Sequence, residues 1–186
     1  MKSLIANTGS YRNLKVYCKA EVIYDLTYYF CKKYLKQGDR TIDQMVQAAR
    51  SGKQNIVEGN EVAATSAETF LKLLNVARAS LQELLVDYKD YLRVRNLRLW
   101  EDNSKEVVAM RELGVEHNSD SAYFVSLAES RSDEVVANMV IVLIYQADMM
   151  LKGYISKHYN EFVEQGGFRE RLTRERVMYR DNKSKS

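Results

Sequence analysis

The chain has 186 residues, of which 46% are hydrophobic, so it is long enough to bury a core and too apolar for a disordered protein. It contains no proline and only eight glycines, which favours a mostly helical chain because proline is the strongest helix breaker. The formal net charge is +3, but residues 169–186 hold seven cations and three acids, so the rest of the chain is close to neutral.

The first predicted helix runs from about residue 13 to residue 37, where apolar side chains recur at helical spacing before Gly38. Cys18 and Cys31 lie on this helix about 20 Å apart, so we expect them not to form a disulfide. With two cysteines and no secretory signal, the expected compartment is the cytoplasm.

Two further helices are predicted from capping patterns. Thr41 with Gln44 forms a capping box that opens the second helix, and Gly59 is expected to be the C′ residue at its end. Gly52 falls in the apolar stripe of this helix, where it would allow a neighbouring helix to approach closely. Thr65 with Glu68 forms a second capping box, opening a third helix that reaches about residue 95 with heptad spacing.

The pattern weakens from residue 96 to residue 131, where only 104–114 is predicted as a short helix and 115–131 is ambiguous. A fourth long helix begins after Ser132 and ends at Gly166 and Gly167. Its apolar run, residues 135–145, is shorter than the ~20 residues that a membrane span needs, so no membrane association is expected.

Four long amphipathic helices predict an all-α fold, an up-and-down four-helix bundle. We expect the bundle to occupy residues 1–167, with 96–131 as an elaborated connection between the third and fourth helices. Residues 168–186 form a separate Arg-rich C-terminal tail.

No pattern of catalytic or metal-binding side chains stands out. The two histidines, His117 and His158, lack motif partners and are expected on the solvated surface. No cysteine and histidine spacing fits a zinc site, and no Glu-x-x-His pair fits a di-iron bundle. We therefore expect no enzymatic activity, no metal and no cofactor.

Two groups of cations could bind nucleic acid. In the tail, arginines interleave with Phe168 and Tyr179, a composition suited to phosphate contacts and base stacking but also to an exposed helix paired by Glu170 and Glu175. The other group gathers where the first and third helices end, which is the same pole of an up-and-down bundle; these cations could instead complement the helix dipoles. The tail candidates are Arg169, Arg171, Arg174 and Arg176, and the pole candidates are Lys32, Lys33, Lys36, Arg40, Arg93, Arg95 and Arg98.

Residues 43–92 carry two adjacent motifs, "QAARSGKQNIVEG" and "ETFLKLLNVARASLQELLVDYKDYL". They resemble the small bacterial proteins encoded by intervening sequences of 23S ribosomal RNA genes, whose second helix ends in a motif like R-A-x-S-x-x-x-N-I-x-E-G and whose third carries A-R-x-S-x-x-E-L. The second half of the chain is similar to the four-helix-bundle suffix segment that accompanies some of these proteins. The matching positions are Ala49, Ser51 (displaced by one place), Asn55, Ile56, Glu58, Gly59, Ala77, Arg78, Ser80, Glu83 and Leu84.

This resemblance implies a four-helix bundle that often assembles as a ring-like homopentamer, with no established catalytic activity. The genes of this family lie inside ribosomal RNA genes, and this genomic association is the only ground on which the resemblance suggests RNA binding. The 96–131 connection and the basic tail depart from the shortest family members.

The leading hypothesis is a non-catalytic, oligomeric helical bundle that binds RNA or DNA through basic surfaces. One alternative is an interaction scaffold with a protein partner, and another is an enzyme that uses carboxylates such as Glu58 and Glu83. Within the motif, we expect Asn55 and Glu58 to hydrogen-bond the 59–66 turn or the backbone near residues 65–69.

Overall fold

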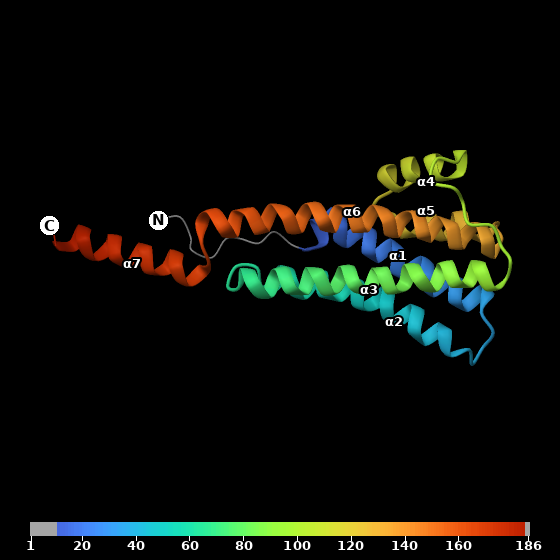
Figure 1. Cartoon of the computed structure of the whole chain (residues 1–186), viewed down its shortest axis with the longest axis horizontal. Coiled ribbons are helices and arrows are strands. Elements are labelled where there is room, and N and C mark those ends of the chain that lie inside the picture. Colours follow the sequence, from blue (N-terminus) through green and yellow to red (C-terminus); the bar gives the residue numbers. More distant parts are fainter. Residues whose placement is uncertain (1–10, 185–186) are drawn as a thin grey trace.

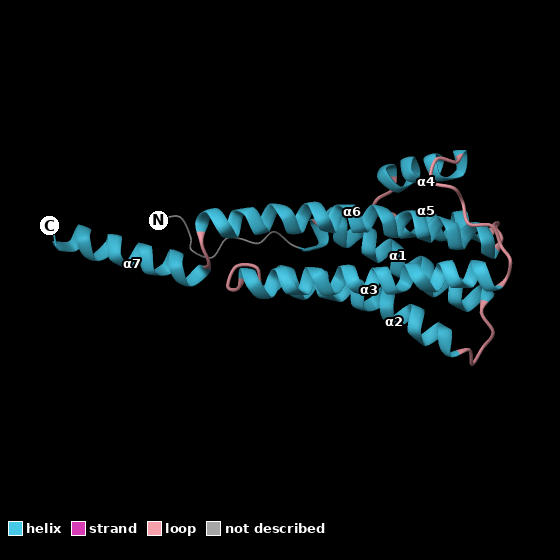
Figure 2. Cartoon of the chain, in the orientation of Figure 1, coloured by secondary structure: helices cyan, strands magenta, loops and turns pink. Residues whose placement is uncertain are grey.

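The computed structural model describes residues 11–184, and this part of the chain contains α-helices and no strand (Figure 2). The predicted all-α class is confirmed, although the described chain has seven α-helices where four long ones were predicted. In chain order they are α1 (Lys15–Tyr34), α2 (Arg40–Val62), α3 (Ala67–Val94), α4 (Lys105–Glu116), α5 (Ser121–Glu129), α6 (Asp133–Gln165) and α7 (Phe168–Ser184), and a 3-10 turn (Tyr11–Asn13) precedes α1.

Four of these helices, α1, α2, α3 and α6, lie side by side along the long axis of the molecule and run in alternating directions (Figure 1). Contacts join α1 to α2, α2 to α3, α3 to α6 and α6 back to α1. We call these four the helical core. The short α4 packs against α6, α5 packs against α1, and α7 projects beyond the end of α6 (Figure 1).

The segment 96–131, predicted as an elaborated connection, forms two short capped helices: α4, at the predicted 104–114 helix, and α5, in the part whose pattern was ambiguous. Ser104 accepts a hydrogen bond from the Val107 backbone N–H at the start of α4, which continues through Gly114 to Glu116. Asp120 accepts one from the Tyr123 N–H at the start of α5. Each helix buries only two or three residues, so its apolar pattern in the sequence is weak.

The cap of α2 lies two residues before the predicted position, and the cap of α3 lies one residue after it. Asp39, not Thr41, caps α2, because its carboxylate accepts the Thr41 backbone N–H at 2.9 Å. Ser66, not Thr65, caps α3 by accepting the Thr69 N–H at 3.2 Å. In both places two residues of good capping type lie within two positions of each other, so the sequence pattern alone does not select one.

The prediction that Gly59 ends the second helix is wrong, because α2 continues through it to Val62. Gly59 is buried, and a Cβ there would lie 3.5 Å from the Leu73 side chain and 3.6 Å from that of Phe70 on α3. Its lack of a side chain therefore serves helix contact and not a left-handed cap. The prediction for Gly52 holds, since a Cβ there would come within 2.7 Å of Leu81 on α3.

The interior combines an aromatic cluster with the apolar face of α6. Phe30 packs edge-on against Tyr88 and Tyr91, and the buried Tyr88 hydroxyl donates to Thr27 Oγ1 at 3.2 Å. By length and composition α6 is apolar enough to cross a membrane, but 67% of its most apolar window is buried inside the protein, as in a core helix. Both Cys18 and Cys31 are free thiols, as predicted.

Candidate nucleic-acid interface

The ends of α1 and α3 lie at the same pole of the molecule, together with the starts of α2 and α6 (Figure 1). Helix dipoles favour cations in the last turns of α1 and α3, which fits Lys32, Lys33 and Arg93. They do not favour Arg40, because it is the first residue of α2. All seven predicted pole cations are exposed: Lys32, Lys33, Lys36, Arg40, Arg93, Arg95 and Arg98.

Acids at the same pole reduce the positive field that the sequence suggested. Arg93 pairs with Asp90 at 2.9 Å. Arg98 donates its backbone N–H to Glu134 at 2.8 Å, and its guanidinium lies 3.3 Å from Glu106. Arg93 and Arg98 are therefore paired with acids, and these acids were not among the residues predicted at this pole.

Two other pole cations have local structural partners. Lys33 donates to the Tyr29 hydroxyl at 2.9 Å and to the Glu129 carbonyl at 2.8 Å, which ties α1 to the end of α5. The guanidinium of Arg95 lies 3.8 Å from the centre of the Tyr91 ring, in a cation–π contact. Within residues 11–184 the pole thus retains three cations with neither an ion pair nor such a contact: Lys32, Lys36 and Arg40.

The tail forms α7, whose cations fall into two sets. Arg171 is half-buried, the guanidinium of Arg174 lies against Gly166, and the Arg169 side chain lies outside the described residues. Arg176, Arg180 and Lys183 are exposed and follow one another at intervals of four and three residues, so they share one face of the helix. We call these three residues the α7 basic face.

The α7 basic face is free of acids along its length. No Asp or Glu stands three or four positions from any of its three cations, so none can pair with them along the helix. Glu170 instead accepts the Gly167 backbone N–H at 2.8 Å, at the start of α7. Exposed Tyr179 lies three residues after Arg176 and four before Lys183, at the edge of this face.

The family-motif residues mainly join helices. Ser51 on α2 and Ser80 on α3 share a hydrogen bond of 2.9 Å between their hydroxyls. Arg78 on α3 pairs with Asp148 on α6 at 2.5 Å, and Lys152 pairs with the same carboxylate at 2.7 Å. These ion and hydroxyl pairs hold α2, α3 and α6 together, which is a structural role.

The expected contacts of Asn55 and Glu58 with the 59–66 turn are not observed. The Asn55 amide donates to the Ser51 carbonyl at 2.9 Å and to the Ser51 hydroxyl at 3.2 Å, because the helix continues past it and its nearest acceptors lie one turn back. Glu58 and Glu83 are both exposed on their helices. The histidines are less solvated than predicted: His117 stacks on Tyr123 at 3.6 Å.

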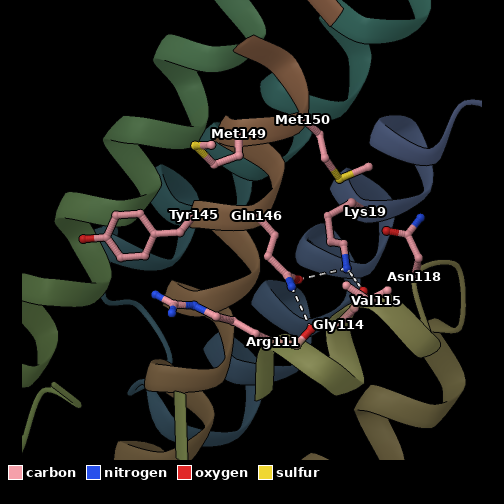
Figure 3. Close-up of a pocket in the computed structure, with 9 residues that line it drawn as sticks. All are labelled: Lys19, Arg111, Gly114, Val115, Asn118, Tyr145, Gln146, Met149 and Met150. Carbon is pink, nitrogen blue, oxygen red and sulfur yellow. Dashed lines mark hydrogen bonds between the residues drawn. The ribbon is translucent and has the colours of Figure 1, made fainter. Parts of the chain in front are cut away.

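A buried lysine that the sequence analysis did not select lies beside an open pocket (Figure 3). Lys19 on α1 is only 1% exposed, and its ammonium donates to the Gly114 carbonyl on α4 and to Gln146 Oε1 on α6 at 3.2 Å. Burial lowers the pKa of Lys19 to about 8. The signal was present in the sequence, since Lys19 stands three residues after Val16 and four before Ile23, inside the buried stripe of α1.

No group of three or more His, Cys, Asp or Glu side chains suited to a metal occurs among residues 11–184. Comparisons with protein families, with curated proteins and with solved structures found no match to this chain.

Proposed function

We propose that this chain is a non-catalytic helical protein that binds RNA through the α7 basic face. The observation that carries the proposal is a run of three exposed cations on one helix face, with no acid in reach along that face. Phosphate backbones attract such a surface, and most of the affinity of nonspecific nucleic-acid binding comes from this attraction.

The position and composition of α7 support a single-stranded ligand. The helix projects away from the helical core, so a strand can approach its exposed face without meeting α2 or α3 (Figure 1). Tyr179, 62% exposed beside Arg176 and Lys183, offers a ring on which an unpaired base can stack. Arginine is suited to this work because its guanidinium binds phosphate in a bidentate manner and stacks on bases.

We further propose that α1, α2, α3 and α6 form an up-and-down four-helix bundle related to the intervening-sequence proteins. In this proposal the bundle self-associates in the cytoplasm. The alternating directions of these helices and the contacts between α1 and α6 support the bundle. Self-association is supported by large apolar side chains that α6 and α7 leave exposed. These are Met149 at 68%, Val163 at 64% and Met178 at 63%.

The direct test is an anisotropy titration of a fluorescein-labelled 20-nucleotide single-stranded RNA at low salt. Replacement of Arg176, Arg180 and Lys183 by Gln is expected to weaken binding about tenfold or more, because three phosphate contacts are removed. The matched control replaces Lys32, Lys36 and Arg40 by Gln, which makes the same charge change at the pole.

The control is expected to lose much less affinity than the α7 variant. An equal or larger loss in the pole variant would move the interface to the pole and contradict the assignment to α7. Circular dichroism of both variants checks that the helix content is retained.

A second candidate function is a protein-binding scaffold. The same exposed apolar residues of α6 and α7 favour it, since such residues are enriched at protein interfaces. Absence of any RNA or DNA binding at low salt would favour the scaffold over the nucleic-acid function.

A further inference from the structure

The pocket beside Lys19 has a chemical character of its own, independent of the α7 basic face. It has a volume of about 450 Å³ and lies where α1, α4 and α6 meet, within the size range of small-molecule sites (Figure 3). Lys19, Arg111, Gly114, Val115, Asn118, Tyr145, Gln146, Met149 and Met150 line it, so two lining residues are cationic and none is acidic.

Lys19 is the buried one of the two cations that line this pocket. Burying an ammonium is costly unless a carboxylate or several hydrogen bonds compensate it. Lys19 is 1% exposed, yet within residues 11–184 no carboxylate pairs with it, and its two acceptors, Gly114 O and Gln146 Oε1, are neutral. An ammonium has three N–H donors, so one remains for a ligand.

The surrounding contacts fix Lys19 in place. Gln146 accepts from Lys19 and donates its own Nε2–H to the Arg111 carbonyl at 2.9 Å, so the side chain of α6 links α1 to α4. A Cβ on Gly114 would collide with the Gln146 amide, so glycine at this position makes room for that link. The donor is therefore held before any ligand arrives, which lowers the entropic cost of binding.

The walls and mouth of the pocket are apolar. Val115 is 74% exposed, Met149 is 68% exposed and Tyr145 is 40% exposed, although large apolar side chains are usually covered. In Figure 3 the Tyr145 ring and the Arg111 guanidinium lie on one side of Gln146, and Lys19 and Met150 lie on the other. An acyl or aryl body would cover these side chains while its acid group neutralises Lys19.

We propose that this pocket binds a small organic carboxylate with an apolar body, such as a medium-chain fatty acid, with its carboxylate against the Lys19 ammonium. An inorganic anion would leave the apolar walls uncovered, and a neutral apolar molecule would leave the Lys19 charge uncompensated. A carboxylate with an apolar tail covers the apolar walls and also compensates the Lys19 charge.

The test is isothermal calorimetry with octanoate as the probe, with octanol and inorganic phosphate as comparison ligands, near neutral pH. Octanoate is expected to bind at least tenfold more tightly than either comparison ligand. Lys19→Met, which keeps the size of the side chain and removes its charge, is expected to weaken octanoate binding at least tenfold. Equal binding of octanoate to Lys19→Met, or no octanoate binding at millimolar concentration, would overturn the proposal.

A second variant avoids the buried position. Met149→Glu places a negative charge at the exposed mouth and is expected to weaken octanoate binding at least tenfold, whereas Val163→Glu, on the exposed surface of the same helix, is expected to leave it unchanged. Equal effects of the two variants would mean that octanoate binds apolar surface without using the pocket, and would contradict the proposal.

Discussion

Between about pH 7 and pH 9.5, Lys19 is expected to raise the free energy of unfolding of the wild-type protein. The Lys19→Met variant is expected to lack this increase. The folded protein holds the Lys19 pKa at about 8, below its ordinary value of 10.5, because the ammonium is buried. Between these two values the unfolded chain binds more protons than the folded chain, so the free energy of unfolding contributed by Lys19 increases with pH. At about 1.4 kcal/mol per pKa unit, the gain over this interval is about 2 kcal/mol.

The comparison with the variant is needed because other groups act in the opposite direction. Burial raises the pKa of the Cys31 thiol to about 12, so at high pH the thiol loses its proton more readily in the unfolded chain than in the folded one. The contribution of Cys31 to the free energy of unfolding therefore falls as the pH rises. The same holds for the Tyr88 hydroxyl, because burial also raises its pKa. Subtracting the Lys19→Met curve from the wild-type curve, both measured by urea unfolding, isolates the lysine. Parallel curves would show that Lys19 is solvated in the folded protein.

The second large effect is expected at the contact between α2 and α3. Gly52→Val should lower the free energy of unfolding by about 3 kcal/mol, because overpacking a core displaces side chains and backbone. A Cβ at Gly52 would lie 2.7 Å and 2.9 Å from atoms of Leu81, which is itself fully buried. The two helices would have to move apart or Leu81 would have to leave its position.

Gly153→Ala on α6 is the matched control for this variant. Apart from its chain neighbours and the nearby backbone of α6, no atom lies within 4 Å of a Cβ at Gly153, so the change is expected to raise stability by up to about 1 kcal/mol through helix propensity. Thermal or urea unfolding of both variants checks the pair. A Gly52→Val protein as stable as the wild type would mean that α2 and α3 are not in close contact in solution.

The sequence was sufficient to predict the helices that have regular apolar stripes and the role of Gly52. It was not sufficient for Gly59, because a glycine near the end of an apolar pattern indicates a left-handed cap or a close contact equally well. The continuation of α2 to Val62 and the burial of Gly59 against Phe70 distinguish the two. The cap residues were misplaced for a similar reason, since Asp39 and Ser66 compete with neighbours of the same chemistry.

The candidate sites were predictable only where they depend on local spacing. Arg176, Arg180 and Lys183 share a face because of their positions along one helix, although only Arg176 was among the predicted tail candidates. The pairing of Arg98 with Glu106 and Glu134 depends on the path of the chain between α3 and α6. The site at Lys19 was not predicted, because its partners Gly114 and Gln146 are 95 and 127 residues away along the chain.

The salt dependence of RNA binding tests the central proposal most directly. The titration with the 20-nucleotide single-stranded RNA is repeated from about 50 to 200 mM KCl for the wild-type protein and for the variant with Gln at 176, 180 and 183. Each phosphate contact on a single strand contributes about 0.7 to the slope of log affinity against log salt, so the variant should lose about 2 from the magnitude of the slope. Equal slopes for the two proteins, or no binding by the wild type at the lowest salt, would contradict the account.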